Sequence, residues 1–331
     1  MTEHDGAAHL ERVVRGWGVG PVVVATVATV APAAGDPRTL VVGVDADPAL
    51  DVELGSVSKA LTGLLFEDAI ERGEVARTTT LADALPVLGD APCAAVTLEA
   101  LATHRSGLPR LPRGSATLRR QWDLVAHGRN PYGESVAEVL AQAARTRLTR
   151  KVNALYSNLG YELLGHAVAA RAGLPYAELM RTRLAEPLGL ASVYVPASSA
   201  DLRPTAMPGF SPRGRPREAW VGEGLGPAGG VRASVPDVAR LAVALLDQAA
   251  PGMAALDPRV RFAGPLRVGS AWMTVPVRHE GQERRITWHN GGTGGFRSFL
   301  GLDRERGTAV VAVSPRARAL DRPARELLLA L

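Results

Sequence analysis

Ser56 and Lys59 are the two residues of this chain whose types and spacing best suit nucleophilic chemistry. They stand in the run Glu53-Leu-Gly-Ser-Val-Ser-Lys-Ala60. The chain holds 38 basic residues, of which only two are lysines. Arginine keeps its proton at any workable pH, whereas a desolvated lysine can lose it. Lys59 could therefore accept the hydroxyl proton of Ser56, which makes Ser56 a candidate nucleophile.

Two further groups of polar residues accompany this pair, Tyr156-Ser-Asn158 and His289-Asn-Gly291. The serine–lysine spacing alone also occurs where a serine starts a helix and the lysine is exposed. Tyr156 alone would suit a core aromatic residue with a satisfied hydroxyl. Together the three groups supply a nucleophile, titratable side chains and an amide, which favours acyl transfer.

The sequence after Ser56 predicts a helix that positions the pair. Apolar residues recur at helical spacing from Ala60 to Ile70, and Gly73 is placed to end the helix. Ser56 would lie at the helix N-terminus, where free backbone N–H groups and the helix dipole favour developing negative charge. Lys59 would lie one turn further along the same face.

The rest of the pattern runs from strands to helices and back to strands. A short amphipathic helix is predicted first, then an antiparallel hairpin, over residues 7–16, 22–30 and 39–44. The middle is mostly helical, with helices over residues 97–103, 135–145, 159–172 and 175–184. Residues 204–230 predict a long loop. The last part predicts a helix, four strands and a closing helix, over residues 235–247, 266–277, 284–289, 298–303, 309–313 and 322–331.

With these motifs the chain resembles the penicillin-recognising serine hydrolases, in the branch of class C β-lactamases, D-Ala-D-Ala carboxypeptidases, D-aminopeptidases and β-lactamase-fold esterases. Ser56-Val-Ser-Lys59, Tyr156-Ser-Asn158 and His289-Asn-Gly291 match its three motifs, and Pro227-Ala-Gly-Gly-Val231 matches an accessory segment. The resemblance implies an α/β (α+β) protein of the β-lactamase/transpeptidase-like fold, an antiparallel sheet flanked by helices plus a largely helical region. We expect residues 1–77 and 225–331 to form the α/β domain and residues 78–224 a mostly helical domain with active-site loops.

The resemblance also implies the catalytic roles. Ser56 would form an acyl-enzyme after Lys59 accepts or relays its proton. Tyr156 would share the base role, because a nearby ammonium makes its phenolate more accessible, and would protonate the leaving group. The backbone N–H groups of Ser56 and Gly292 would form the oxyanion hole.

The same resemblance implies that the substrate is bound by Asn158, His289, Asn290 and Gly291. Asn158 would hydrogen-bond Lys59 and a substrate amide or carbonyl, and the small residues of the third motif let a strand approach the substrate. Class C β-lactamases usually carry lysine where this chain has His289, and histidine is largely neutral near pH 7. The prediction is therefore an esterase-type hydrolase of small carboxylic esters or amides.

Other functions share the same motifs. An amine or alcohol could take the acyl group from Ser56, which would make the protein an acyltransferase or peptide cyclase. A D-amino-acid peptidase or weak β-lactamase comes next, and then a non-catalytic binding protein. The sequence does not distinguish water from another acyl acceptor, and it does not predict an oligomeric state.

The composition of the chain limits the classes of partner and cofactor that we expect. The net charge of +5 comes from scattered arginines, and aromatic residues make up only 5%, so we expect no nucleic-acid partner. Cys93 is the sole cysteine and the histidines show no ligand spacing, so we expect no metal and no cofactor. Without a visible export signal or a membrane-spanning segment, we expect a cytoplasmic location and no membrane partner.

Two arginine-rich loops, residues 107–132 and 204–226, are expected to rim the site. They could attract an anionic substrate, or they could form an ordinary solvated basic surface.

Overall fold

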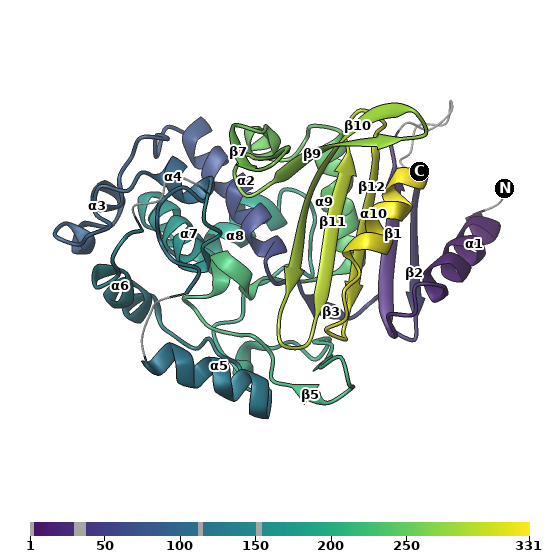
Figure 1. The fold of residues 1–331 in the computed structure, drawn as a ribbon, viewed down its shortest axis with the longest axis horizontal. Helices are drawn as coiled ribbons and strands as arrows, with labels where there is room; N and C mark the ends of the chain where they lie inside the picture. Colours follow the sequence, from purple (N-terminus) through teal and green to yellow (C-terminus); the bar gives the residue numbers. More distant parts are fainter. Residues whose placement is uncertain (1–2, 30–37, 112–114, 150–153) are drawn as a thin grey trace.

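The computed structural model describes residues 3–29, 38–111, 115–149 and 154–331. Its centre is an eight-stranded antiparallel sheet in the order β2-β1-β12-β11-β10-β9-β8-β7 (Figure 1). The strands are β1 Val22–Ala28, β2 Arg38–Val44, β7 Val260–Ala263, β8 Leu266–Val268, β9 Met273–His279, β10 Gln282–Gly292, β11 Arg297–Asp303 and β12 Thr308–Ser314. Both ends of the chain therefore build one sheet, and the predicted antiparallel sheet flanked by helices is confirmed.

The middle strands of this sheet are covered on both faces. Every residue of β12 is buried, and six of the seven residues of β1 are buried. Helix α9 (Val235–Leu246) packs on one face, and α1 (Glu3–Arg15) and α10 (Asp321–Ala330) pack on the other. Double coverage explains why these strands read as almost continuous runs of valine and alanine instead of alternating with polar residues.

The remaining helices gather beside the sheet (Figure 1). They are α2 Val57–Glu71, α3 Leu81–Ala84, α4 Leu98–Ala102, α5 Ser115–His127, α6 Val136–Ala144, α7 Asn158–Ala172 and α8 Tyr176–Met180. Helices α2 and α7 pack against each other and are buried around almost their whole circumference. A helix that is apolar on all sides belongs in the interior. The two helices that carry the predicted motifs are thus the most deeply buried.

Several predicted elements differ from the structure. Helix α5 lies where we expected a loop, although Leu118, Trp122 and Val125 stand at helical spacing and could have indicated it. These three side chains are exposed, so α5 lacks the usual buried apolar face. The predicted strand 266–277 is two strands, because residues 269–272 leave the ladder and Ser270 turns to a buried glutamate. Strand β7 was not predicted.

Two short sheets complete the fold, β3 Asp51–Glu53 with β6 Arg232–Ser234, and β4 Gly209–Phe210 with β5 Pro216–Arg217. The β4–β5 pair lies in the predicted long loop. Within the described residues, no helix is both long enough and apolar enough to cross a bilayer. The domain boundaries proposed from the sequence stay predictions.

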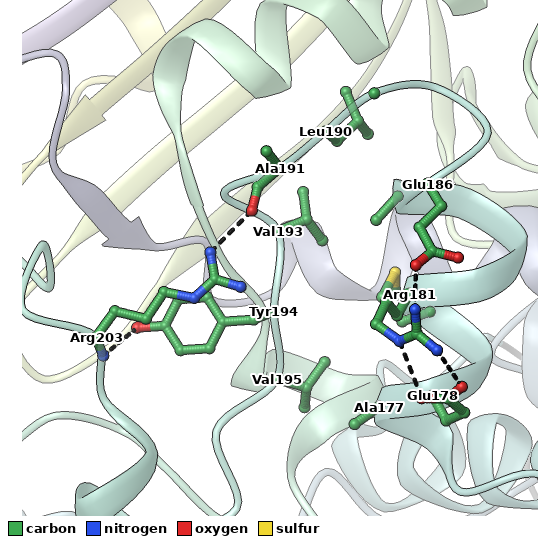
Figure 2. Close-up of a pocket in the computed structure, with 13 residues that line it drawn as sticks. Ala177, Glu178, Arg181, Glu186, Leu190, Ala191, Val193, Tyr194, Val195 and Arg203 are labelled. Carbon is green, nitrogen blue, oxygen red and sulfur yellow. Dashed lines mark hydrogen bonds and ion pairs between the residues drawn. The ribbon is translucent and has the colours of Figure 1, made fainter.

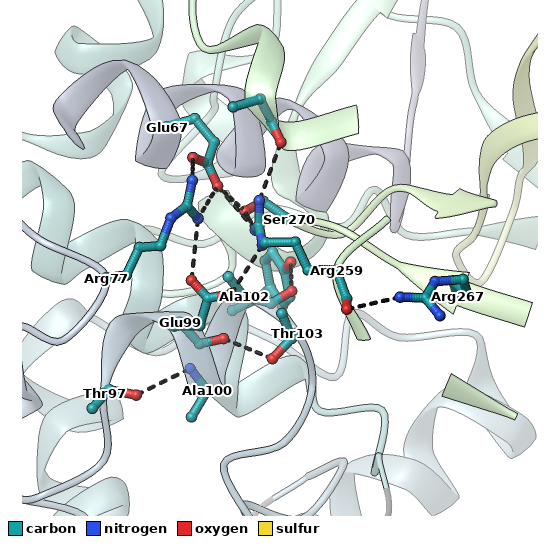
Figure 3. A network of polar contacts seen from close by, with 12 residues as sticks. Glu67, Arg77, Thr97, Glu99, Ala100, Ala102, Thr103, Arg259, Arg267 and Ser270 are labelled. Carbon is teal, nitrogen blue, oxygen red and sulfur yellow. Dashed lines mark hydrogen bonds and ion pairs between the residues drawn. The ribbon is translucent and has the colours of Figure 1, made fainter. Parts of the chain in front are cut away.

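A buried ion-pair network joins α2 to α4 and to the segment around β7 (Figure 3). The Glu67 carboxylate is 1% exposed and lies 2.5 Å from Arg77 Nη2 and 2.9 Å from Arg259 Nη2. Glu99 pairs with both arginines, and the Ser270 hydroxyl donates to Glu67 at 2.6 Å. Since a buried carboxylate needs charged or hydrogen-bonding partners, this network fixes the helical region to the sheet.

We expect Glu67→Gln to lower the free energy of unfolding by about 2 kcal/mol, because two arginines lose their shared carboxylate. Urea denaturation measures the change. Glu326→Gln is the control, since Glu326 pairs with Arg322 on the surface, where an ion pair contributes little. Equal midpoints for the two variants would show that the network does not stabilise the fold.

Candidate active site

Ser56 and Lys59 meet at the start of α2. Ser56 is the N-cap residue, but its side chain makes no capping hydrogen bond to the helix. Its Oγ instead accepts a hydrogen bond from Lys59 Nζ at 3.1 Å. Ser56 is partly exposed and Lys59 is fully buried. The structure thus brings the first two predicted residues together, with the serine open to a ligand and the lysine behind it.

Burial changes the acid–base character of Lys59. Desolvation penalises its charged form and lowers the pKa of the ammonium to about 7. The charge of Arg110 lowers this pKa further, while Glu162 raises it. In the described part of the chain, no carboxylate lies within 4.0 Å of Nζ. A substantial share of Lys59 is therefore neutral near pH 7 and able to accept a proton.

The second acceptor for Lys59 is a backbone carbonyl that the sequence analysis did not assign. Nζ donates to the Ala228 oxygen at 2.5 Å, in the turn η4 (Gly226–Gly230). Two side chains of α2 hold this turn on either side of Ala228. Thr62 Oγ1 donates to the Pro227 oxygen at 2.7 Å, and Ser58 Oγ accepts from the Val231 nitrogen at 3.1 Å. The matched Pro227-to-Val231 segment was the available signal.

Tyr156 lies against Lys59, just before α7. Lys59 Nζ is 5.1 Å from the centroid of the Tyr156 ring. Desolvation raises the pKa of Tyr156 to about 12, although its interaction with the Ser56 side chain and the charge of Arg110 both lower it. The expected accessible phenolate is therefore not what this environment favours, because burial outweighs the nearby positive charge. Tyr156 is a neutral phenol near pH 7.

His104 packs on the other side of Tyr156, with the ring centroids 4.5 Å apart. Its Nδ1 accepts a hydrogen bond from the Ser157 backbone, and burial lowers the pKa of the imidazole well below its usual value. From its sequence context, His104 was expected to be a structural or exposed residue and not a metal ligand. The structure shows a neutral side chain that fixes the segment carrying Tyr156.

Asn158 begins α7 and differs from its expected role. Its Nδ2 donates to the Tyr132 hydroxyl at 3.0 Å, and its buried Oδ1 has no hydrogen-bond partner among the described residues. Among the described residues, Lys59 Nζ donates to Ser56 and Ala228, and the expected hydrogen bond between Asn158 and Lys59 is not formed. The free Oδ1 is available to a ligand that donates a hydrogen bond.

The end of β10 approaches the start of α2 through glycines. A Cβ atom on Gly291 would lie 2.1 Å from the Leu54 oxygen and 3.0 Å from the Ser56 nitrogen, so no larger residue fits. A Cβ atom on Gly55, whose φ is +51°, would lie 2.7 Å from the Gly292 nitrogen. The backbones of Ser56 and Gly292 are therefore close together, as the predicted oxyanion pair requires.

His289 and Asn290 point to different sides of β10, since successive strand residues alternate. His289 is buried, with its ring centroid 6.4 Å from that of Tyr156. Desolvation and the charge of Lys59 lower the pKa of His289 to about 3, so the imidazole is neutral near pH 7. Asn290 donates its amide to Asp321 of α10. The structure does not bring the Asn290 side chain to Ser56.

The expected rim is partly aromatic. Tyr132 and Trp220 pack edge to face, with centroids 4.9 Å apart. The indole nitrogen of Trp220 is buried without a partner. Of the rim arginines, Arg110 is exposed and its guanidinium lies 6.0 Å from the Tyr156 ring centroid. Arg113 lies outside the described residues.

A separate cavity of about 550 Å³ lies beside α8 and the π-helical turn η2 (Arg181–Ala185) (Figure 2). Figure 2 shows its charged side chains engaged with protein groups: Arg181 contacts Glu178 and Glu186, and Arg203 donates to the Ala191 oxygen at 2.9 Å. None of the predicted site residues lines this cavity. The Ser56 site is therefore the candidate active site.

Comparison with solved structures identifies the fold. A class C β-lactamase from Rhodobacter sphaeroides superposes with a TM-score of 0.76 at 21% identity, covering 98% of this chain and 97% of that one. The D-alanine carboxypeptidase AmpC from Burkholderia cenocepacia superposes with a TM-score of 0.74 at 22% identity, covering 99% of each chain. The fold is thus the predicted β-lactamase/transpeptidase-like fold.

Sequence comparison identifies the family. The D-alanyl-D-alanine-carboxypeptidase/endopeptidase AmpH of Escherichia coli K12 is 30% identical over 156 residues, which are 45% of this chain and 39% of AmpH. The match thus spans well under two thirds of that relative. The family model described as Beta-lactamase matches residues 26–331, nearly the whole chain. The chain therefore belongs to the β-lactamase family.

Proposed function

We propose that this protein hydrolyses small carboxylic esters or amides through an acyl-enzyme on Ser56. The contact between Ser56 Oγ and the buried Lys59 Nζ at 3.1 Å carries this proposal. A lysine with a pKa of about 7 is half deprotonated at neutral pH, where a general base works best. An arginine could not serve in its place.

In the proposed acylation, neutral Lys59 takes the proton of Ser56 while Oγ bonds to the substrate carbonyl carbon. The backbone N–H groups of Ser56 and Gly292 stabilise the resulting oxyanion. The phenol of Tyr156 donates its proton to the leaving alcohol or amine, and Lys59 returns a proton to Tyr156. Water then attacks the acyl carbon while this same pair takes one of its protons; the bond between Oγ and the acyl carbon breaks, and the pair returns that proton to Oγ, which releases the carboxylic acid and restores Ser56. The high pKa of Tyr156 supports a donor role and leaves the base role to Lys59.

His289 supports esters or amides over β-lactams. A neutral imidazole stands where class C β-lactamases usually place a lysine, so it offers no charge to a drug carboxylate. Arg110, exposed beside Tyr156, supports a substrate that carries an anionic group at the mouth of the site. Asn158 Oδ1 and the backbone at Gly291 are the proposed substrate contacts.

A second candidate is cleavage of D-alanyl peptides, which the name of AmpH favours. Transfer of the acyl group to an amine or alcohol uses the same first step. Intact-mass measurement after incubation with esters, D-alanyl peptides and β-lactams, with and without added amines, distinguishes these reactions. The cytoplasmic location expected from the sequence stays a prediction.

We expect a fluorophosphonate probe to label the wild-type protein at Ser56 and not to label Ser56→Ala. Lys59→Arg should fold but label about 10³-fold more slowly, because its side chain keeps the charge and cannot accept a proton. Intact-mass spectrometry measures both. Equal labelling of wild type and Ser56→Ala would remove Ser56 as the nucleophile, and rapid labelling of Lys59→Arg would remove Lys59 as the base.

The labelling rate of the wild-type protein should rise with pH, with a midpoint near the Lys59 pKa of about 7. Below this pH the ammonium cannot accept the serine proton, and above it the neutral amine can. Labelling reactions that are stopped at timed intervals at a series of pH values give the rate profile. Circular dichroism at each pH shows whether the fold is unchanged. A flat profile between about pH 5.5 and about pH 8.5 would contradict a base of this pKa.

Arg110→Gln should raise KM for an anionic ester and leave KM for its neutral analogue unchanged at low salt. The reason is that an exposed guanidinium attracts an anion, and salt screens this attraction. Steady-state kinetics on the matched pair of esters test this effect. Arg285→Gln, at an exposed surface pair with Glu305, is the control. Equal KM values for both esters in the wild type would exclude an anion-binding rim.

A further inference from the structure

Glu162 is a buried carboxylate that the mechanism above does not use. It lies on α7 one turn beyond Asn158, and its side chain therefore lies on the same face of the helix. The residue is 5% exposed. Helix α7 packs against α2 and against the η4 turn, the two elements that hold Lys59 and Ala228.

Glu162 differs from every other buried acid of the described residues in having no arginine partner. Six other buried carboxylates each lie within 4.0 Å of an arginine: Asp51, Glu53, Glu67, Asp68, Asp237 and Asp303. Within the part of the chain that the structure describes, no lysine or arginine lies within that distance of Glu162. A buried carboxylate without an ion-pair partner is costly, so its retention in an arginine-rich chain calls for a function.

Lys59 lies close to this part of α7, because its Nζ is 6.0 Å from the ring centroid of Tyr161, the residue before Glu162, and α2 packs against α7. Burial raises the pKa of Glu162 to about 7, and the charge of Lys59 acts to lower it. Glu162 in turn favours the charged form of Lys59, whose pKa is also about 7. Two interacting groups with similar pKa values titrate as a pair, and each proton lost changes the affinity of the other group for its proton.

A small cavity lies beside the carboxylate. Glu162 lines a space of about 20 Å³ together with Tyr132 and Gln142, and this volume admits one water molecule. Tyr132 also accepts the hydrogen bond from Asn158. The carboxyl group therefore borders a space that could hold one hydrogen-bonding water molecule.

We propose that Glu162 is a positioning residue that holds the charged form of Lys59 and thereby sets the pH above which Ser56 can be acylated. This inference rests on the proposed function of Ser56 and Lys59. It assigns Glu162 no contact with the substrate.

The other groups around the pair do not change charge in the same pH range. Lys59 faces His104 and His289, whose pKa values burial lowers, and Tyr156 and Tyr161, whose pKa values burial raises.

On the side of Glu162, burial raises the pKa of Tyr132, so its hydroxyl stays neutral. Across the cavity, Arg120 and Glu134 form an ion pair with each other. Lys59 and Glu162 are thus the groups that titrate near neutral pH in this part of the described structure.

The chain's two lysines make a direct test practical. Protein labelled with ¹³C at the lysine ε-carbon gives two lysine signals, and Lys151→Arg assigns the one from Lys59. In Glu162→Gln the Lys59 signal should titrate about one pH unit lower than in the wild type, because the neutral amide no longer stabilises the ammonium. The acidic limb of the labelling profile should move down by the same amount, while the rate at high pH stays unchanged.

Glu134→Gln is the matched control, because it removes an acid from the same cavity wall whose charge is already paired with Arg120. Equal Lys59 midpoints in wild type and Glu162→Gln, or the same shift in Glu134→Gln, would overturn the inference. A lower rate at every pH with an unmoved midpoint would also overturn it, since this result indicates a structural role. Should Glu162→Gln fail to fold, Glu162→Asp must still move the midpoint.

The lysine titration separates this inference from the proposed function. If Ser56 is not labelled but the Lys59 midpoint depends on Glu162, the proposed function fails and the coupling stands. If Ser56 is labelled with a midpoint near pH 7 that Glu162→Gln does not move, the coupling fails and the proposed function stands.

Discussion

The burial of one lysine amine beside Ser56, the proposed nucleophile, is the constraint on which the site depends. A solvent-exposed lysine is fully protonated near pH 7. Burial of Lys59 disfavours its charged form and lowers its pKa to about 7. The structure supplies Nζ with two acceptors, Ser56 Oγ and the Ala228 oxygen, and with no carboxylate in direct contact among the described residues. An ion pair at Lys59 would raise its pKa and remove the neutral amine that proton transfer requires.

The scaffold meets this constraint by burying two helices on nearly every side. Helix α2, capped by Ser56, carries Lys59, and α7 carries Asn158 and Glu162. Close backbone approaches bring the remaining parts into place. A Cβ atom on Gly165 of α7 would lie 2.3 Å from Pro227, so only glycine lets the η4 turn pack this closely against the helix. In this position the Ala228 carbonyl accepts the hydrogen bond from Lys59 Nζ.

Arginine and lysine occupy different kinds of buried site because arginine keeps its charge on burial and lysine can lose it. Arginine forms the structural pairs of the interior, such as Arg232 with Asp51 and Arg284 with Asp303, because it stays charged and donates in several directions. The described lysine, Lys59, stands where the proposed mechanism needs a charge that can change. Glu162 fits this division, since an arginine beside it would neutralise its field and uncouple it from Lys59.

Local sequence determined much of this protein. Apolar periodicity predicted α2, α7 and the strands near both chain ends, and the three-residue spacing of Ser56 and Lys59 placed them on one helix face. Motif resemblance predicted the fold and the family, which the structural and family comparisons confirm. Tertiary structure alone decided the rest, because burial and contacts between distant segments have no local signature. It placed Ala228 at Lys59, turned Asn290 toward α10 and made Tyr156 a neutral phenol. Among the described residues, it also left Asn158 Oδ1 without a hydrogen-bond partner and Glu162 without an arginine or lysine within 4.0 Å. The desolvation that sets these pKa values exists only once α2, α7 and β10 have packed together.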